Sequence, residues 1–154
     1  MKFNAREDIE APISKVWAVA TDFDSFELAA LRRGVDVIRQ TGSAVPAWQA
    51  TFTFKGKPRT LALRQERAEA PGLLVFHGEG RLVSGTMTVE LVELGPRRTR
   101  MTVTTELRPL TLAARLFLQS VKLARGRAVR RYQQGVARLA TMIEARSRGQ
   151  AAGF

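Results

Sequence analysis

Cysteine is absent from this chain of 154 residues, and histidine occurs once, as His77. Without cysteine there is no disulfide bond, no thiolate nucleophile and no cysteine metal ligand, and nothing indicates an oxidising compartment. One histidine with scattered carboxylates gives no metal-ligand spacing. The sequence therefore predicts neither a metal nor a cofactor.

Long apolar runs are also missing. None approaches the roughly 18 residues that span a bilayer. The first residues, MKFNARED, lack the apolar core of a signal peptide. Hydrophobic residues make up 45% of the chain and charged residues 25%, as in a globular protein. We therefore expect one cytoplasmic domain over residues 1–154, with a frayed tail over 147–154.

Acidic residues are scarce in the last third of the chain. From Arg108 onward there are ten basic residues and one acid, Glu144, so this segment carries +9 of the net charge of +11. A nearly neutral body with one basic segment indicates an anionic partner, such as a membrane, a nucleic acid or an acidic ligand. A solvated face in a bacterial protein rich in arginine is the plain alternative.

The apolar periodicity predicts an α+β protein. Residues 2–10 are expected to be extended, and Pro12 suits the start of the first of two short helices, which end near Gly34. The apolar period then becomes two, with Gly or Pro turns between six strands, which is typical of an antiparallel meander. Pro109 ends the last strand, and a stripe from Phe117 to Ile143 predicts one long helix over about 110–146.

The opening of the chain resembles a known superfamily. Ile9-Glu10-Ala11-Pro12-Ile13-Ser14-Lys15-Val16-Trp17, then Thr21-Asp22-Phe23-Asp24-Ser25-Phe26, resembles the START/Bet v 1-like (SRPBCC) proteins, which include polyketide cyclases/dehydrases and lipid carriers. The resemblance implies a helix-grip fold. In this fold a curved antiparallel sheet wraps around a long C-terminal helix, and a largely apolar cavity lies between the two. It implies ligands such as lipids, quinones or polyketides. No catalytic residue is shared by the whole superfamily, so none is carried over.

Large, adaptable side chains on the predicted strands and the long helix are candidates for the cavity wall, although they would equally fill a core. Two polar residues on the helix stripe are candidate anchors: an arginine can clamp an anionic ligand group or extend to solvent, and a tyrosine can contact a ligand or simply pack. The candidate ligand-binding residues are Trp48, Phe52, Phe54, Leu63, Phe76, Met87, Val89, Met101, Val103, Phe117, Val121, Arg125 and Tyr132.

Two groups have candidate catalytic chemistry. His77 is the one weak candidate for a general acid or base, because its ordinary pKa is near 6.5; a structural or surface histidine is the alternative. Asp22, Asp24 and Glu27 form an acidic group, which we interpret as helix caps and first-turn residues, since Asp is favoured there.

The basic helix offers a further candidate surface. Its membrane- or anion-facing residues are predicted to be Arg127, Arg130, Arg131 and Arg138. Three functions follow from the sequence. The first is binding or transport of a small apolar ligand in the cavity, with contact to an anionic membrane as a subsidiary hypothesis. The second is a cyclase or dehydratase acting on an aromatic or polyketide substrate. The third is an interaction module for RNA or an acidic protein; nucleic acid is less favoured because no recognition motif accompanies the charge.

Overall fold

The computed structural model describes residues 1–149, within which seven strands form one antiparallel sheet in the order β1-β7-β6-β5-β4-β3-β2. The strands are β1 (Lys2–Ile9), β2 (Asp36–Arg39), β3 (Ala47–Phe54), β4 (Lys57–Glu69), β5 (Leu73–Glu79), β6 (Val83–Gly95) and β7 (Arg98–Pro109). From β2 to β7, neighbours in sequence are neighbours in the sheet, and β1 pairs with β7. The predicted α+β class and meander are confirmed.

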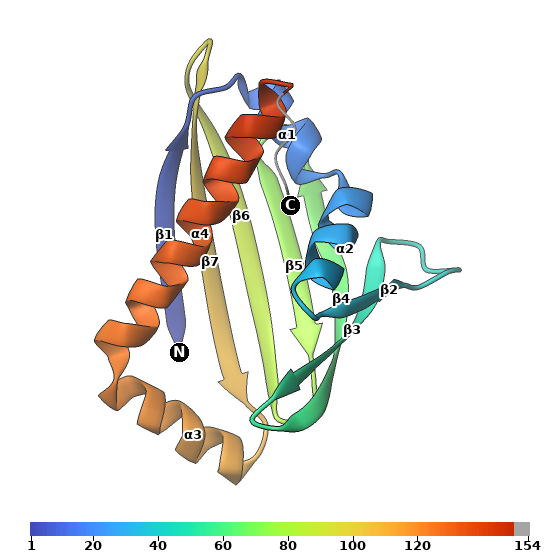
Figure 1. Cartoon of the computed structure of the whole chain (residues 1–154), viewed down its shortest axis with the longest axis vertical. Coiled ribbons are helices and arrows are strands. Elements are labelled where there is room, and N and C mark those ends of the chain that lie inside the picture. Colours follow the sequence, from blue (N-terminus) through green and yellow to red (C-terminus); the bar gives the residue numbers. More distant parts are fainter. Residues whose placement is uncertain (150–154) are drawn as a thin grey trace.

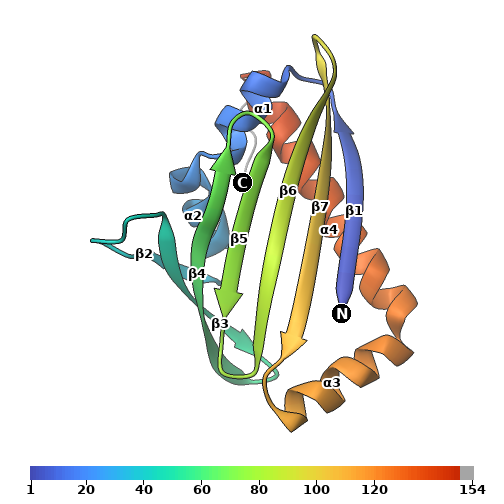
Figure 2. The same ribbon diagram turned by 180° about the vertical axis from the view of Figure 1, so that it is seen from behind.

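Turn chemistry sets the register of the hairpins. The β3–β4 hairpin turns at Lys55 and Gly56, which both have positive φ (52° and 75°). This left-handed pair is the geometry of a two-residue type I′ turn, whose twist matches that of the flanking strands. Figure 1 shows the curved sheet with every helix on its concave side, and Figure 2 shows the convex side, which the described chain leaves without a helix.

Two short helices follow β1, as expected: α1 (Ile13–Ala20) and α2 (Phe23–Arg32). Pro12 is the N-cap of α1. Asp22 caps α2, because its carboxylate accepts hydrogen bonds from the backbone N–H and the hydroxyl of Ser25 (3.4 and 2.6 Å). The Ser25 hydroxyl, together with Arg146, holds the pKa of Asp22 below its ordinary value, against the effect of burial. The capping role expected for Asp22 is thus present.

The predicted single long helix is wrong in one respect. It consists of α3 (Leu112–Leu123) and α4 (Arg125–Ser147), which meet at Ala124, a residue outside helical geometry (φ −105°, ψ 32°). The two helices run in different directions (Figure 1). Helix α3 packs at the end of β7, whereas α4 lies along β1 and against α1. One straight helix cannot make both contacts.

The main core lies under α4. It is formed by inward-facing residues of β1, β6 and β7, with Val16 of α1 and with Val136, Ala140 and Ile143 of α4. Ile9, Val16 and Met101 are fully buried. Ser147, the last residue of α4, is buried and bonded to the Ile143 carbonyl (2.6 Å); residues 150–154 of the predicted frayed tail lie outside the described residues. Among residues 1–149, no helix combines the length and apolarity needed to cross a bilayer.

Candidate functional site

An apolar pocket of about 500 Å³ lies between the concave face of the sheet, α2 and the C-terminal half of α4. Ligand sites in proteins are typically concave, mostly apolar spaces of 300–1,000 Å³ with a few polar groups. The lining residues are Ala20, Phe23, Phe26, Glu27, Val37, Trp48, Leu61, Leu63, Leu74, Phe76, Gly78, Val83, Ser84, Gly85, Thr86, Met87, Val89, Met101, Thr105, Leu107, Leu139 and Ile143.

Two glycines form part of the pocket floor. Gly78 of β5 and Gly85 of β6 are direct partners in the sheet, and both line the pocket. A Cβ atom at Gly78 would lie 2.9 Å from Cδ2 of Leu63, and one at Gly85 would lie 3.0 Å from Cδ2 of Leu107. Neither glycine has a positive φ. A side chain at either position would therefore have to displace the Leu63 or Leu107 side chain, and at Gly85 it would also meet the Glu106 carbonyl oxygen at 3.0 Å. The missing side chains leave part of the floor bare.

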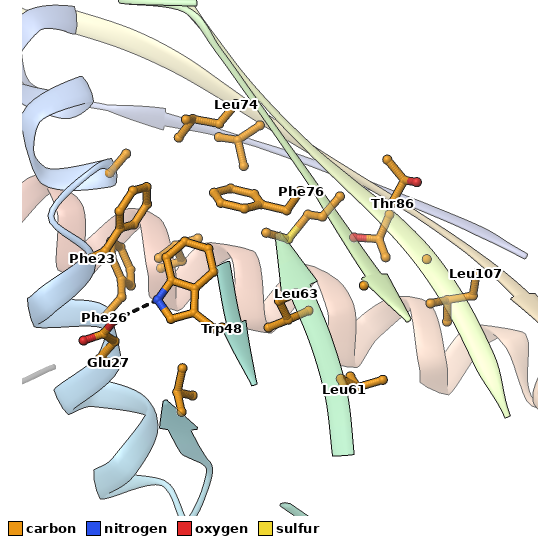
Figure 3. Close-up of a pocket in the computed structure, with 18 of the residues that line it drawn as sticks. Phe23, Phe26, Glu27, Trp48, Leu61, Leu63, Leu74, Phe76, Thr86 and Leu107 are labelled. Atoms are coloured by element: carbon orange, nitrogen blue, oxygen red, sulfur yellow. Dashed lines mark hydrogen bonds between the residues drawn. The ribbon is translucent and has the colours of Figure 1, made fainter. Parts of the chain in front are cut away.

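Aromatic rings form the wall beneath α2 (Figure 3). The ring of Phe23 packs edge-on against Trp48, with centroids 5.1 Å apart, and against Phe76 at 6.2 Å. Trp48 and Phe76 are also 6.2 Å apart. Edge-to-face and tilted pairs at these distances are favourable beyond the area that they bury. The cluster fixes α2 over the β3 and β5 end of the concave face.

Glu27 is the only ionisable residue among the described residues that line the pocket. Its Oε1 atom accepts hydrogen bonds from Nε1 of Trp48 and from Nε of Arg39, both at 2.7 Å. Arg39 also pairs with Asp24 (2.8 Å), and Glu27 holds the pKa of Arg39 above its ordinary value. The carboxylate thus orients Trp48 and ties α2 to β2. Thr105 is a further polar lining residue on the concave face; Ser84 and Thr86 also border the pocket, but they pair with Glu79 and His77, so their side chains are on the opposite face.

The family follows from the sequence. Residues 1–144 match the family model described as "Polyketide cyclase / dehydrase and lipid transport". The chain belongs to this family. The superfamily resemblance given by the opening residues is thereby confirmed. None of the curated proteins compared with the chain matches it.

Solved structures agree with this family assignment at the level of the fold. The crystal structure of the Thermus thermophilus protein TTHA0849 is 19% identical, with a TM-score of 0.68 over 99% of this chain and 100% of that chain. The Zhui aromatase/cyclase of a Streptomyces species is 17% identical, with a TM-score of 0.69 over 99% and 98%. A START superfamily protein of Mycobacterium smegmatis is 11% identical, with a TM-score of 0.56 over 86% and 97%. All three have the helix-grip arrangement in common with this chain.

Six of the predicted ligand-binding residues line the pocket: Trp48, Leu63, Phe76, Met87, Val89 and Met101. They come from five neighbouring strands, β3 to β7, and all lie on the concave face. Alternation along each strand therefore predicted the face correctly. Their role in binding stays a prediction.

Five predicted apolar residues lie elsewhere. Phe52 and Phe54 are on the predicted, concave face of β3 but beyond the end of the pocket. There Phe54 packs edge-on against Phe117 of α3, with ring centroids 5.8 Å apart. Val103 is buried in the core under α4. Phe117 and Val121 belong to α3, and the break at Ala124 carries that helix away from the lining.

The two predicted polar anchors do not line the pocket either. Arg125 is exposed, because it begins α4 just after the break, beyond the part of the helix that covers the core. The Tyr132 hydroxyl donates to the Val103 carbonyl (3.1 Å) and bonds Oγ1 of Thr105 (3.0 Å). Its ring stacks on Phe3 at 5.2 Å. Burial raises the pKa of Tyr132, while the Thr105 hydrogen bond opposes that rise. Tyr132 is a satisfied packing residue.

His77 lies on the opposite face of the sheet. It stands between Phe76 and Gly78, which both line the pocket, and successive side chains of a strand point to opposite faces. No hydrogen bond joins its imidazole to any other residue of the described chain. His77 therefore does not reach this pocket, and its placement does not favour the candidate acid/base role, because a catalytic base must reach the substrate.

Sequence reasoning missed the contribution of α2 and of the end of α4. Phe23, Phe26 and Glu27 face the pocket from α2, and Leu139 and Ile143 face it from α4. The aromatic pair at spacing three was a usable signal, because residues three apart share a helix face. The four predicted membrane- or anion-facing residues, Arg127, Arg130, Arg131 and Arg138, are exposed and form no ion pair within residues 1–149.

Proposed function

We propose that this protein binds a small apolar ligand in the pocket between the sheet and the helices, and carries it. The observation that supports this most is the pocket itself: about 500 Å³ of space with one ionisable lining residue. Such a space excludes strongly charged substrates, since burying an unpaired charge is costly. A lipid tail, quinone or polyketide-like ring system fits it in size and polarity.

The polar residues of the lining suggest how a ligand would be oriented. Glu27 lies beside the aromatic cluster (Figure 3), while Thr105 of β7 is on the concave face, where its Oγ1 atom is bonded to the Tyr132 hydroxyl. An apolar body with one hydroxyl group would place that group at either position. A carboxylate accepts but does not donate hydrogen bonds, so Glu27 favours a ligand hydroxyl over a ligand carboxylate.

The second candidate is the cyclase or dehydratase activity that the family description and the Zhui aromatase/cyclase suggest. It would need a group that moves a proton inside the pocket. Glu27 is the one ionisable candidate among the described lining residues, and its Oε1 atom is already held by Trp48 and Arg39. Binding without chemistry is therefore the function that we favour. The interaction-module hypothesis assumed a filled core and is not favoured by this pocket.

Native mass spectrometry of protein purified without detergent tests the proposal. We expect a mass excess of one apolar molecule per chain, extractable into organic solvent. A protein that retains nothing, and that also fails to take up added long-chain alcohols or quinones, would contradict the binding function. Conversion of such a compound into a new product would instead favour the enzyme.

A further inference from the structure

Helix α3 has two apolar faces on opposite sides. The inner face is buried or half-buried and consists of Ala114, Phe117, Leu118 and Val121. The outer face carries Leu112, Leu116 and Leu123, which are 71%, 58% and 92% exposed. At about 100° per residue, the three leucines fall within about 40° of one another and about 180° from Ala114 and Val121. A solvated helix normally has a polar outer face.

The inner face already has its partners. The ring of Phe117 packs against Phe54, and Nζ of Lys55 lies 4.2 Å from the centroid of Phe117. The N-cap Thr111 accepts a hydrogen bond from the Ala114 N–H at 3.1 Å. The orientation of α3 is thus fixed by its inner contacts. The leucine stripe (Leu112, Leu116 and Leu123) is accordingly an outer surface of the folded protein.

Cations surround this stripe. Arg115 and Lys122 lie about two turns apart on one flank of the stripe, and Arg125 and Arg127 follow Leu123 across the break. All four are exposed, and none forms an ion pair with another residue of the described range 1–149. The described acids do not neutralise this charge, so it is available to an anionic partner.

We propose that the outer face of α3 docks on an anionic lipid bilayer. The leucine stripe enters the boundary between headgroups and acyl chains, while Arg115, Lys122 and the first arginines of α4 contact lipid phosphates. Long basic side chains keep their charge at headgroup level while their stems stay in apolar surroundings. An anionic bilayer thereby removes the exposed leucines from water and pairs the exposed cations with phosphates at the same time.

A second copy of this chain fits less well. A two-fold contact through the stripe would place Arg115 and Lys122 of one copy near their counterparts in the other, because such a contact uses the same patch twice. Repulsion between these cations would oppose the contact. A nucleic acid would meet the cations but leave the leucines in water.

The position of α3 connects the docking surface with the pocket. Val83 and Leu107 line the pocket, and Val83 pairs with Pro109 just before α3 begins. Docking through α3 brings this end of the sheet to the lipid. The purpose of docking, which is exchange of an apolar ligand with the bilayer, rests on the proposed function, but the docking itself does not.

Co-sedimentation with vesicles tests the surface. We compare the unchanged protein with the double variant Leu116→Glu/Leu123→Glu, using phosphatidylcholine vesicles with and without phosphatidylglycerol. The double variant loses the apolar area that two leucines would bury in the bilayer, so we expect it to bind anionic vesicles at least about tenfold more weakly. We expect weak binding to neutral vesicles and release from anionic ones by added salt.

The matched control is Val92→Glu/Leu94→Glu. These residues are 53% and 43% exposed and lie at the β6–β7 hairpin, at the opposite end of the molecule from α3 (Figure 1). This variant changes the net charge by the same amount, so equal weakening by both variants would show a charge effect alone and overturn the docking surface. Equal binding to neutral vesicles, or no binding to either kind, would also overturn it.

Two further measurements complete the test. Sedimentation velocity shows whether the stripe joins two copies: a dimer that Leu116→Glu/Leu123→Glu dissociates would replace lipid docking by self-association. The substitution Gly78→Val, which narrows the pocket, should leave vesicle binding unchanged. Vesicle binding that fails while ligand binding persists rejects the docking surface alone, and the reverse result rejects the proposed function alone.

Discussion

The two halves of the concave sheet face have the same kind of side chain and different surroundings. On β1 and β7, inward residues such as Ile9 and Val103 are covered by α4 and buried. On β3 to β5, inward residues such as Leu63 and Phe76 face α2, which stands off the sheet over an open pocket. The difference teaches that the covering helix, and not the strand pattern, decides whether an apolar residue is core or cavity wall.

The largest expected difference between the halves is in stability. Ile9 is fully buried, so Ile9→Ala should lower the free energy of unfolding by about 2–5 kcal/mol. Leu61→Ala, in the half-buried pocket wall, should cost only about 1 kcal/mol. Urea unfolding measures both. Equal costs would mean that the pocket half is packed as tightly as the core.

Removing the N-cap of α2 should have the next largest effect on stability. Asp22→Ala removes the N-cap of α2 and the ion pair with Arg146 (3.0 Å), and should cost about 1–2 kcal/mol at neutral pH. The folded-state pKa of Asp22 is lowered, so its contribution is present above the unfolded pKa of about 3.9 and is lost as pH falls through the folded value. Urea unfolding at decreasing pH should therefore bring the variant and the unchanged protein together. A constant difference down to the acid limit would contradict this role.

A smaller effect is expected from the hydroxyl that joins α4 to β7. Tyr132→Phe removes the bonds to Val103 and Thr105 and should cost about 1 kcal/mol. Because Tyr132 does not line the pocket, the affinity of the pocket for an apolar fluorophore such as N-phenyl-1-naphthylamine should change by no more than about twofold. A large loss of affinity with little loss of stability would return Tyr132 to the set of ligand anchors.

The smallest expected effect is the shift in the pKa of Tyr132. Tyr132 is the only tyrosine of the chain, so the absorbance of its phenolate is specific. Its pKa is raised by burial, so its midpoint should lie above the ordinary value near 10 when folded and return to it in urea. The raised pKa means that its stabilising effect is complete below pH 10 and is lost at higher pH. A folded midpoint at or below 10 would contradict the burial of the hydroxyl.

The sequence supported the fold better than the site, for physical reasons. Alternation gave the strands, the order of elements and the inward face, since these depend on local pattern. Gly126 beside the break is compatible with a kink, but the apolar stripe gives no sign of it: inner residues of α3 such as Val121 and of α4 such as Val136 keep nearly one phase, as they would on a straight helix. A stripe shows which side of a helix is apolar and not the direction in which the helix runs.

Prediction of the site was partial for the same reason. The strand residues of the pocket were predicted correctly because alternation along a strand decides which face a side chain is on. Arg125 was predicted to face the cavity, but the break between α3 and α4 leaves it exposed and outside the lining. Glu27 was interpreted as part of an acidic capping group. In the structure it lines the pocket, and hydrogen bonds from Trp48 and Arg39 hold its carboxylate there. Those partners are 21 and 12 residues away in sequence, and no local pattern joins them.

The pocket is tested most directly by binding of a neutral apolar fluorophore, N-phenyl-1-naphthylamine, to two variants of adjacent residues. Gly78→Val places a side chain in the pocket against Leu63, whereas His77→Val makes its change on the opposite face of the same strand. Saturable binding that His77→Val retains and Gly78→Val weakens, with both variants folded by circular dichroism, is the result predicted. Equal binding by both variants would contradict an apolar ligand site in this pocket.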